Sequence, residues 1–203
     1  MSLSISIIII IFTCLVSIPA FSNHNQLYKL SLQPYLVKNN REYYRFLTSG
    51  FVHADYGHLF FNMLTLYFFG DVAEGFFLMY FNSKFLYILY YVLAIIVANM
   101  PSFFKHRNDP NYISLGASGA ISAIVFTAIL LHPWATISLF FAIRMPAVLY
   151  GVLFLVISAY LSRKGGGNIN HDAHLWGAVF GIVFPLIFHP DLASDFIYQI
   201  THH

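Results

Sequence analysis

Long apolar runs separated by short polar stretches are the feature that most limits how this chain can fold. They recur along 203 residues, of which 59% are hydrophobic and only 9% are charged. Soluble domains carry about 25% charged residues, so this chain lacks the polar coat of a water-soluble globule. A bilayer crossing needs about 20 mostly apolar residues, which leaves room for six crossings. We therefore expect an all-α integral membrane protein, a six-transmembrane helical bundle that forms a single domain over residues 1–203.

The expected spans cover residues 3–21, 57–72, 84–98, 118–131, 146–161 and 172–188. The first run lacks the Lys or Arg that opens a secretory signal, so we interpret it as a retained span. Residues 22–56 mix charged and aromatic side chains, which indicates an amphipathic loop in the membrane interface. Two prolines and several charges predict a loop over 99–115. Residues 137–143 are too short to cross and are interpreted as a surface or re-entrant piece, and 163–167 as a flexible connection.

Polar side chains inside apolar spans are costly in lipid and therefore indicate function. Asn62, Ser118 and His174 each lie near the N-terminal end of the second, fourth or sixth expected span. Even-numbered spans of a serial bundle run in the same direction, so we expect these residues on one side of the membrane at similar depth. This convergence depends on the span count, and a different count would remove it.

Ser118 and His174 have the chemistry of a nucleophile and its base. A serine hydroxyl is a poor nucleophile until a base accepts its proton, and neutral histidine is the usual base near pH 7. Ser118 lies in Gly-Ala-Ser-Gly (116–119) at an expected helix start, where free N–H groups point toward a developing oxyanion. Gly177 and Gly181 follow His174 on its helix face and allow a neighbouring helix to pack closely.

His58 and Asn62 are four residues apart and share one helix face. Both can donate hydrogen bonds, so they suit stabilisation of negative charge on a carbonyl oxygen. Each candidate also has an ordinary interpretation: a serine at a helix start is usually a cap, and an intramembrane histidine can serve packing. The convergence of four polar groups on one side of the membrane favours catalysis.

The same residues resemble the motifs of the rhomboid family of intramembrane serine proteases. Its G-x-S-G motif matches residues 116–119, its A-H-x-x-G-x-x-x-G motif residues 173–181, and its H-x-x-x-N motif residues 58–62. G-x-S-G alone is a weak signal, whereas three motifs in the correct order on the correct spans are strong. Gly116, Gly119, Gly177 and Gly181 match the glycines of these motifs. Gly70 and Glu74 resemble the family's G-x-x-x-E motif. Arg45 resembles the arginine of its tryptophan–arginine pair, with Tyr44 in place of the tryptophan.

By this resemblance, Ser118 attacks the scissile peptide bond and His174 acts as base and then as acid, without a third acidic residue. His58, Asn62 and the Ser118 N–H would hold the oxyanion. The implied partners are the lipid bilayer and transmembrane protein substrates, which a serine endopeptidase of this kind cuts in or next to their spans. No cofactor or metal is implied, a net charge of +2 gives no case for nucleic acid, and the oligomeric state is left open.

Ser122 departs from the family pattern. Family members often have an aromatic residue four positions after the nucleophile, where it packs on the base. Another residue must then orient His174, and the candidates are Trp176 and the phenylalanines, which the sequence does not rank.

The expected location combines two conflicting signals. Basic residues concentrate in the loops beside the expected site, and the positive-inside rule would put that side in the cytoplasm. The resemblance implies the opposite orientation. We follow the resemblance and expect a bacterial inner membrane with the active site opening to the outer face.

Other classes of membrane protein fit less well. A zinc metalloprotease needs a pattern such as H-E-x-x-H, which is absent. An intramembrane aspartyl protease needs two aspartates inside apolar spans, and Asp71 alone comes close. No inverted repeat indicates a transporter. The main alternative is a non-catalytic rhomboid-like membrane protein that binds client transmembrane helices; such relatives usually lack the serine or the histidine, and this chain has both.

Overall fold

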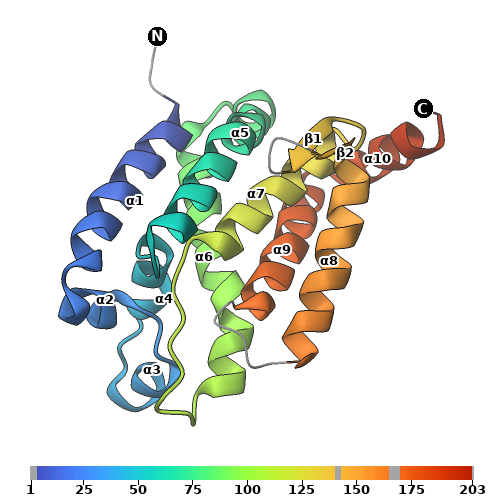
Figure 1. Ribbon diagram of the computed structural model, residues 1–203. Coiled ribbons are helices and arrows are strands. Elements are labelled where there is room, and N and C mark those ends of the chain that lie inside the picture. Colours follow the sequence, from blue (N-terminus) through green and yellow to red (C-terminus); the bar gives the residue numbers. More distant parts are fainter. Residues whose placement is uncertain (1–3, 140–142, 165–169, 203) are drawn as a thin grey trace.

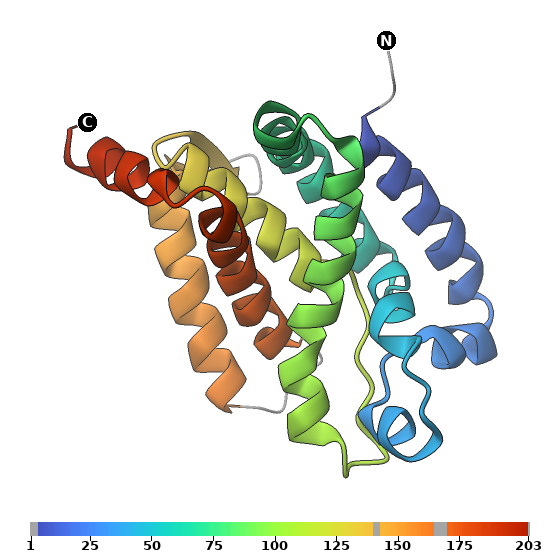
Figure 2. The ribbon, with the colours of Figure 1, turned by 180° about the vertical axis from the view of Figure 1, so that it is seen from behind.

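The computed structural model describes residues 4–139, 143–164 and 170–202, which form a bundle of helices and a short β-hairpin (Figures 1 and 2). Residue 3 of the first expected span and residues 165–167 of the expected flexible connection lie outside the described residues. In chain order the elements are α1 (Ile5–Phe21), α2 (His24–Leu30), α3 (Pro34–Asn40), α4 (Arg45–Thr48), η1 (Ser49–Phe51), α5 (Tyr56–Phe81), α6 (Lys84–His106), α7 (Ser118–Leu131), β1 (Thr136–Leu139), β2 (Ile143–Pro146), α8 (Ala147–Lys164), α9 (His171–Phe188) and α10 (Asp191–Thr201).

The outer surface of the bundle is apolar. Among the described residues, α5, α6, α8 and α9 are long and apolar enough to cross a membrane, and α1 and α7 are shorter apolar helices. Leu15, Met79 and Phe85 are 69%, 80% and 70% exposed on the surface. Soluble monomers rarely expose large contiguous apolar patches, so lipid is the solvent for this surface. The expectation of a helical, multi-pass membrane protein is confirmed, and six apolar helices are consistent with the expected bundle.

Polar residues beside the apolar runs begin three of the long helices. Asp55, Ser83 and Asn170 each accept a hydrogen bond from the backbone N–H three residues later, at 2.7, 3.4 and 3.0 Å. Such caps satisfy N–H groups that a helix start leaves free, and in lipid no water can replace them. Asn82 ends α5 in the left-handed conformation, with φ of 48°, and the chain turns into α6.

The loop predicted from Asn99 onward is wrong at its start, because α6 continues to His106 with Pro101 inside the helix. The side chain of Asn99 donates hydrogen bonds to a carbonyl of α4 and a hydroxyl of η1, and Ser102 donates to Asn170. These polar residues therefore fix the helix against its neighbours. Membrane helices tolerate proline where surrounding groups satisfy the backbone atoms that it frees.

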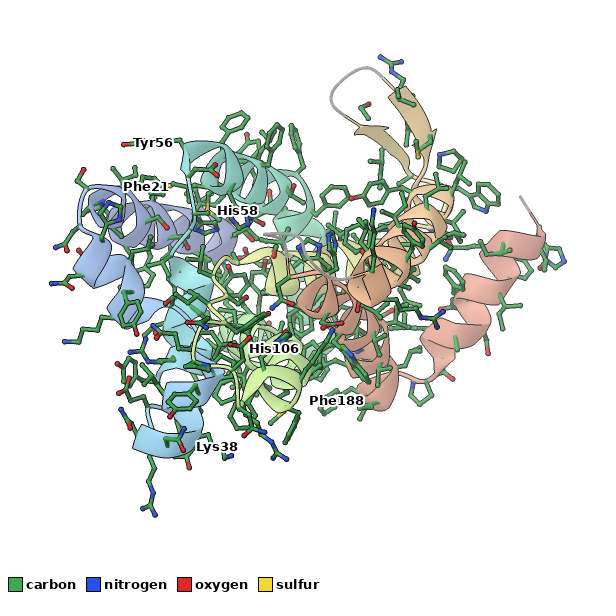
Figure 3. All side chains as sticks on the ribbon, turned by 60° about the horizontal axis from the view of Figure 1, so that its bottom comes forward. Phe21, Lys38, Tyr56, His58, His106 and Phe188 are labelled. Carbon is green, nitrogen blue, oxygen red and sulfur yellow. The ribbon has the colours of Figure 1, made fainter. Side chains whose placement is uncertain are left out.

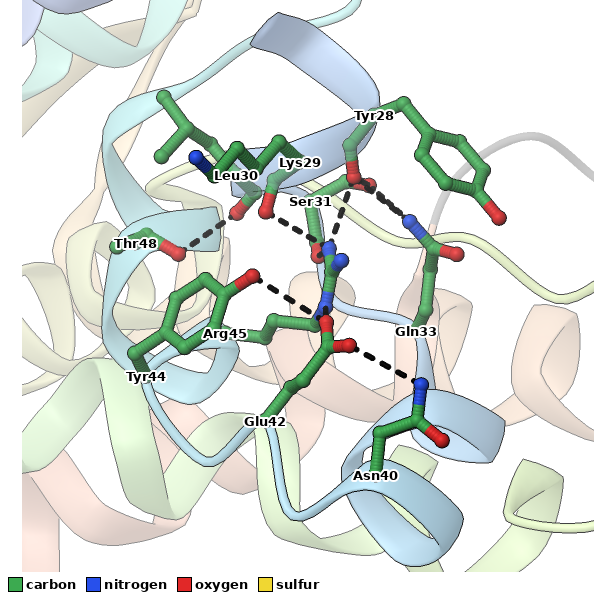
Figure 4. Close-up of polar contacts among 10 residues, drawn as sticks. All are labelled: Tyr28, Lys29, Leu30, Ser31, Gln33, Asn40, Glu42, Tyr44, Arg45 and Thr48. Atoms are coloured by element: carbon green, nitrogen blue, oxygen red, sulfur yellow. Dashed lines mark hydrogen bonds and ion pairs between the residues drawn. The ribbon is translucent and has the colours of Figure 1, made fainter. Parts of the chain in front are cut away.

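The first loop is a folded unit around a buried arginine (Figure 4). Arg45 Nη1 donates to three backbone carbonyls of the segment 28–31, each at 2.8 Å, and Nε donates to Glu42 at 2.6 Å. The guanidinium also lies 5.4 Å from the centre of the Tyr44 ring. A planar guanidinium can bind several oxygens at once, so Arg45 joins α2 to the segment that precedes η1.

Gly70 and Glu74 on α5 contact the N-terminal end of α1. Glu74 accepts hydrogen bonds from the Ser4 hydroxyl at 2.7 Å and from the N–H groups of Ile5 and Ser6 at 2.9 and 3.4 Å. A carboxylate at a helix N-terminus satisfies free N–H groups and favours the helix dipole. A methyl group at Gly70 would overlap the Ser6 side chain, so glycine admits α1 at this point.

The hairpin and α10 close the end of the bundle that lies opposite the first loop (Figure 1). Thr136 pairs with Pro146 and Leu139 with Ile143 in antiparallel register. The apolar piece predicted over 137–143 is thus part of a hairpin, although 140–142 lie outside the described residues. The tail beyond the last span forms α10, and Trp134 donates from Nε1 to the carbonyl of Gln199 on it at 2.8 Å.

The contact between α7 and α9 forms the centre of the bundle. All residues of α7 from Gly119 to Leu130 are buried. A Cβ atom at Gly177 would overlap the carbonyl oxygen of Gly119, and one at Gly181 would overlap that of Ala123. Backbone therefore lies directly against backbone, which only small residues permit.

A buried polar relay joins the same two helices to α6. The Tyr90 hydroxyl lies 2.7 Å from the Thr127 hydroxyl, and Thr127 donates to the carbonyl of Gly181 at 2.8 Å. Thr127 is thus the donor to Gly181, and Tyr90 donates to Thr127. These groups satisfy one another where lipid offers no partner.

α7 is too short to cross the bilayer. Its 14 residues span about 21 Å, against a hydrocarbon core of about 30 Å. Figure 1 shows the segment after α6 returning into the bundle before α7 begins. Ser118, the first residue of α7, therefore lies within the bundle.

Gly181→Ala is expected to lower the free energy of unfolding by about 1–3 kcal/mol, because its methyl group must overlap the backbone at Ala123. Gly75→Ala is the matched control: a Cβ atom there meets nothing within 4 Å. Helix propensity should make that change neutral or stabilising by up to about 1 kcal/mol. Thermal unfolding in detergent measures both variants. Equal effects would contradict the close α7–α9 contact.

Candidate active site

A cavity of about 920 Å³ lies between α5, α7, α8, α9 and the segment 109–115. Ser118 and His174 both line it, as do His58 and Asn62. Four polar residues predicted from three separate spans thus meet in one cavity. Apolar side chains of α7 and α8 also line the pocket. Its wall is therefore partly polar and partly apolar.

The backbone before Ser118 has a conformation that requires glycine. Gly116 has φ of +117°, which L side chains rarely adopt, and its N–H donates to the carbonyl of Ser49 at 2.9 Å. Ser118 then occupies the first position of α7. The N–H of that position has no partner within the helix, so it is free to bind an oxygen in the cavity.

The helices that carry Ser118 and His174 touch near their first turns. Gly119 and Gly177, which follow Ser118 and His174 in their helices, form the close backbone contact. Within the described residues no hydrogen bond joins the two side chains. The His174 ring instead stacks on Phe154 of α8, with ring centres 5.8 Å apart. Catalytic hydrogen bonds are often long without substrate and shorten when it binds.

His58 and Asn62 line the wall of the cavity on α5. Figure 3 shows His58 directed toward the other long helices and Tyr56, at the start of the same helix, lying beside Phe21 of α1, with ring centres 4.4 Å apart. A Cβ atom at Gly116 would lie 2.5 Å from Cε1 of His58, so the imidazole packs on this glycine. Asn62 donates one amide hydrogen to the carbonyl of His58 at 3.0 Å, which leaves its second donor available.

The start of α9 is fixed by polar contacts to three neighbouring segments. Asn170 accepts from Ser102 of α6 and donates to Ser114, each at 2.9 Å. Asp172 accepts from Lys105 at 2.9 Å and from Ser162 of α8. Asp172 therefore binds α6 and α8, and His174 has no hydrogen bond from it. These contacts set the position of the helix that carries His174.

Sequence analysis missed His53, which is fully buried behind the candidate nucleophile. The N–H of Ala117 donates to Nε2 of His53 at 3.3 Å. The other ring nitrogen, Nδ1, then carries the proton and donates to the Ser17 hydroxyl at 2.9 Å. Ser17 in turn donates to the carbonyl of Phe51 at 2.8 Å. His53 thus ties α1 to the backbone that precedes Ser118.

The surroundings keep His53 neutral. Burial, reinforced by the neighbouring His58, lowers the pKa of His53 from 6.5 to about 3. Neutral imidazole has one donor and one acceptor, and the structure uses both. A sequence pattern could not predict these contacts, because Ser17 and Ala117 lie 36 and 64 residues from His53 in the chain.

The comparisons with known proteins assign the chain to a family. The family model described as "Rhomboid domain" matches residues 40–191, well over half of the chain. The chain belongs to the rhomboid family. This rhomboid match covers the candidate site and every helix from α4 to α9.

Curated relatives agree with this assignment. RHOMBOID-like protein 12, mitochondrial, of Arabidopsis thaliana is 35% identical over 68% of this chain and 44% of its own length. Rhomboid-like protein 11, chloroplastic, of the same plant is 31% identical over 73% and 54%. YdcA of Bacillus subtilis, named as a candidate rhomboid protease, is 26% identical over 73% and 68%. This rhomboid chain spans about half the length of the two plant relatives.

The names of these relatives bear on location. Two of them are named mitochondrial and chloroplastic, so the comparisons do not support the expected bacterial inner membrane. The expectation of an integral, multi-pass membrane protein is confirmed for this rhomboid.

His53→Leu is expected to lower the free energy of unfolding by about 1–3 kcal/mol near neutral pH, because it leaves the buried N–H of Ala117 without an acceptor. His24→Leu is the control, since His24 is an exposed histidine on α2. Thermal unfolding in detergent compares the two variants with the wild type.

The same pair of proteins should differ in pH dependence. The pKa of His53 is lowered on folding, so its stabilising effect is complete above pH 6.5 and is lost as the pH falls toward 3. The gap in stability between wild type and His53→Leu should therefore narrow on acidification. A gap that stays constant or widens would contradict a neutral, buried His53.

Proposed function

We propose that this chain is an intramembrane serine endopeptidase that hydrolyses peptide bonds in or next to transmembrane helices of other proteins. The observation that carries the proposal is the shared cavity: a serine at a helix start, a histidine and two further hydrogen-bond donors line one hollow inside a lipid-facing bundle. Membership of the rhomboid family and the likeness to YdcA support it.

The reaction begins with the transfer of the Ser118 proton to His174. The Ser118 oxygen attacks the scissile carbonyl carbon, and the imidazolium then gives its proton to the leaving amine. Water, activated by the same imidazole, hydrolyses the acyl-enzyme and restores the serine. Two residues thus serve as nucleophile and as base and acid, and Asp172 takes no part because it binds Lys105 and Ser162.

The negative charge that develops on the carbonyl oxygen needs donors that are already in position. Three lie around the cavity: the free N–H of Ser118, the imidazole of His58 and the second amide hydrogen of Asn62. His58 rests on Gly116, which keeps this donor beside the backbone of the nucleophile.

Water and substrate would reach the site by different routes. The segment 109–114 brings polar groups to the mouth of the cavity, which can therefore hydrate a site below the membrane surface. A substrate helix must unwind locally, because its own hydrogen bonds shield its peptide bonds. We therefore propose cleavage near small or helix-breaking residues at the end of a substrate span.

We propose that the cavity opens on the outer face of the membrane, opposite to the cytoplasmic side that the positive-inside rule would give. Part of the basic charge on the cavity side has local partners: Arg45 binds carbonyls of the first loop, and Lys105 pairs with Asp172. These two residues have structural reasons for their charge, which weakens the positive-inside argument for the opposite orientation. A reporter fused to the C-terminus tests it.

A non-catalytic rhomboid-like protein that binds client helices is the second candidate. One observation favours it: in the part of the chain that the structure describes, Ser118 and His174 share no hydrogen bond. Such a protein would use the same cavity for binding and would have no need of proton transfer between these residues.

The test is cleavage of a single-span test substrate in detergent or liposomes by wild type, Ser118→Ala and His174→Ala. Each substitution should reduce the rate by at least about a thousandfold, because each removes one partner of the proton transfer. A fluorophosphonate probe should label the wild type and fail to label Ser118→Ala.

Ser158→Ala is the matched control, since Ser158 is a buried serine of α8 that does not line the cavity. It should cleave and label like the wild type. A correctly folded wild type that neither cleaves nor labels would overturn the protease proposal in favour of the client-binding protein.

A further inference from the structure

The inner face of α8 carries two aromatic rings among small side chains. Ala147, Gly151 and Ser158 are buried along α8. Tyr150 and Phe154, whose ring centres lie 6.0 Å apart, line the cavity from the same helix. A Cβ atom at Gly151 would lie 3.1 Å from Ile129, so α8 approaches α7 closely one turn before Phe154. The ring of Phe154 therefore projects from α8 toward α7 and α9.

Phe154 contacts the candidate base directly. Its ring centre lies 5.8 Å from that of His174 with 29° between the planes, which is a stacked arrangement. The Phe154 ring also packs on Phe126 of α7, with ring centres 5.6 Å apart and 54° between the planes, and on Tyr150 of α8, at 6.0 Å and 34°. Both Phe154 and His174 line the cavity, so the stack forms part of its wall.

α7 supplies no aromatic ring for this purpose. The residue one turn after Ser118 is Ser122, and its hydroxyl donates to the carbonyl of Ser118 at 2.8 Å. Ser122 is thus occupied by its own helix and leaves the face of the imidazole to Phe154. Trp176, the other candidate from the sequence, is 45% exposed on the outer surface.

We propose that Phe154 is a positioning residue that holds the His174 imidazole in the orientation that serves Ser118, a proposal that rests on the proteolytic function. Aromatic stacking restricts rotation of the ring without adding a charge or a proton acceptor. Because the ring belongs to α8, the orientation of the base depends on where α8 lies. A displacement of α8 away from α9 separates the stack and leaves the His174 ring against the edge contact with His171 on its own helix.

The contacts of α8 make this dependence strong. Its outer face is exposed to lipid at Val152, Val156 and Ile157, and near its C-terminal end Ser162 donates to Asp172 of α9. The same α9 segment carries His174 two residues later. The hydrogen bond at Ser162 and the stack at Phe154 therefore hold α8 against the same turns of α9.

The experiment measures the rate of fluorophosphonate labelling of Ser118 and the kcat for a single-span substrate. Phe154→Leu keeps an apolar side chain and removes the ring, so both rates should fall about twofold to tenfold with little change in KM. Phe154→Tyr keeps the ring and should stay close to the wild type. Tyr160→Leu removes a lipid-facing ring from the same helix, 64% exposed, and should have no effect.

A second variant separates positioning from packing. Adding Ser122→Phe to Phe154→Leu returns a ring to the cavity from α7, and labelling should recover at least in part. Thermal unfolding in detergent verifies that each protein is folded.

The possible failures are distinguishable. If folded Phe154→Leu is labelled as fast as the wild type, this inference is overturned and the protease proposal stays intact. A fall of equal size in Phe154→Tyr would also overturn it, because the ring would then have no special part. A wild type that does not label at all overturns the protease proposal itself.

Discussion

The meeting of two helix backbones inside lipid is the constraint on which the rest of this molecule depends. Gly177 and Gly181 let α9 lie directly against α7 at Gly119 and Ala123, and Thr127 adds a hydrogen bond to the carbonyl of Gly181. Lipid provides little hydrophobic drive for two helices to associate, so close packing and buried hydrogen bonds must supply the stability. Once α7 and α9 are fixed in this way, their first turns lie side by side, and the polar residues of those turns share one cavity. The site is therefore a consequence of small residues placed one and two turns further along.

Much of the architecture was predictable because lipid makes the signals simple. Apolar runs located the long helices, and Asp55, Ser83 and Asn170 stood beside them as caps. Polar residues inside the spans, above all Ser118 and His174, indicated a common depth once the even-numbered spans were counted. The prediction failed at Asn99, where polarity and a nearby proline suggested a loop. The side chains of Asn99 and Ser102 have hydrogen-bond partners from other elements, so their polarity stabilises a helix that continues. Local composition could not reveal those partners.

Two residues that the sequence could not identify share one property. His53 was missed, and Phe154 was one of several phenylalanines that the sequence did not rank. His53 contacts Ser17 and Ala117, and Phe154 contacts His174, and each contact joins different elements of the fold. A buried neutral histidine in a loop and a phenylalanine in a lipid-facing helix look ordinary in a sequence. Their importance arises from what the fold brings against them. Ser122 stands where family members often have an aromatic residue, which indicated that another ring packs on His174. The sequence could not identify α8 as the helix that carries this ring.

The shortness of α7 has a consequence for the surroundings of this protein. A helix of fixed length, anchored at its far end near the hairpin, keeps Ser118 at a constant height relative to the rest of the bundle. The headgroup plane, by contrast, moves with the acyl chains of the lipid, because bilayers thin or thicken to match the proteins that they hold. The distance between the headgroup plane and Ser118 is therefore smaller in a thin bilayer than in a thick one. Hydrophobic mismatch thus becomes a determinant of how far the proposed nucleophile lies from the membrane surface.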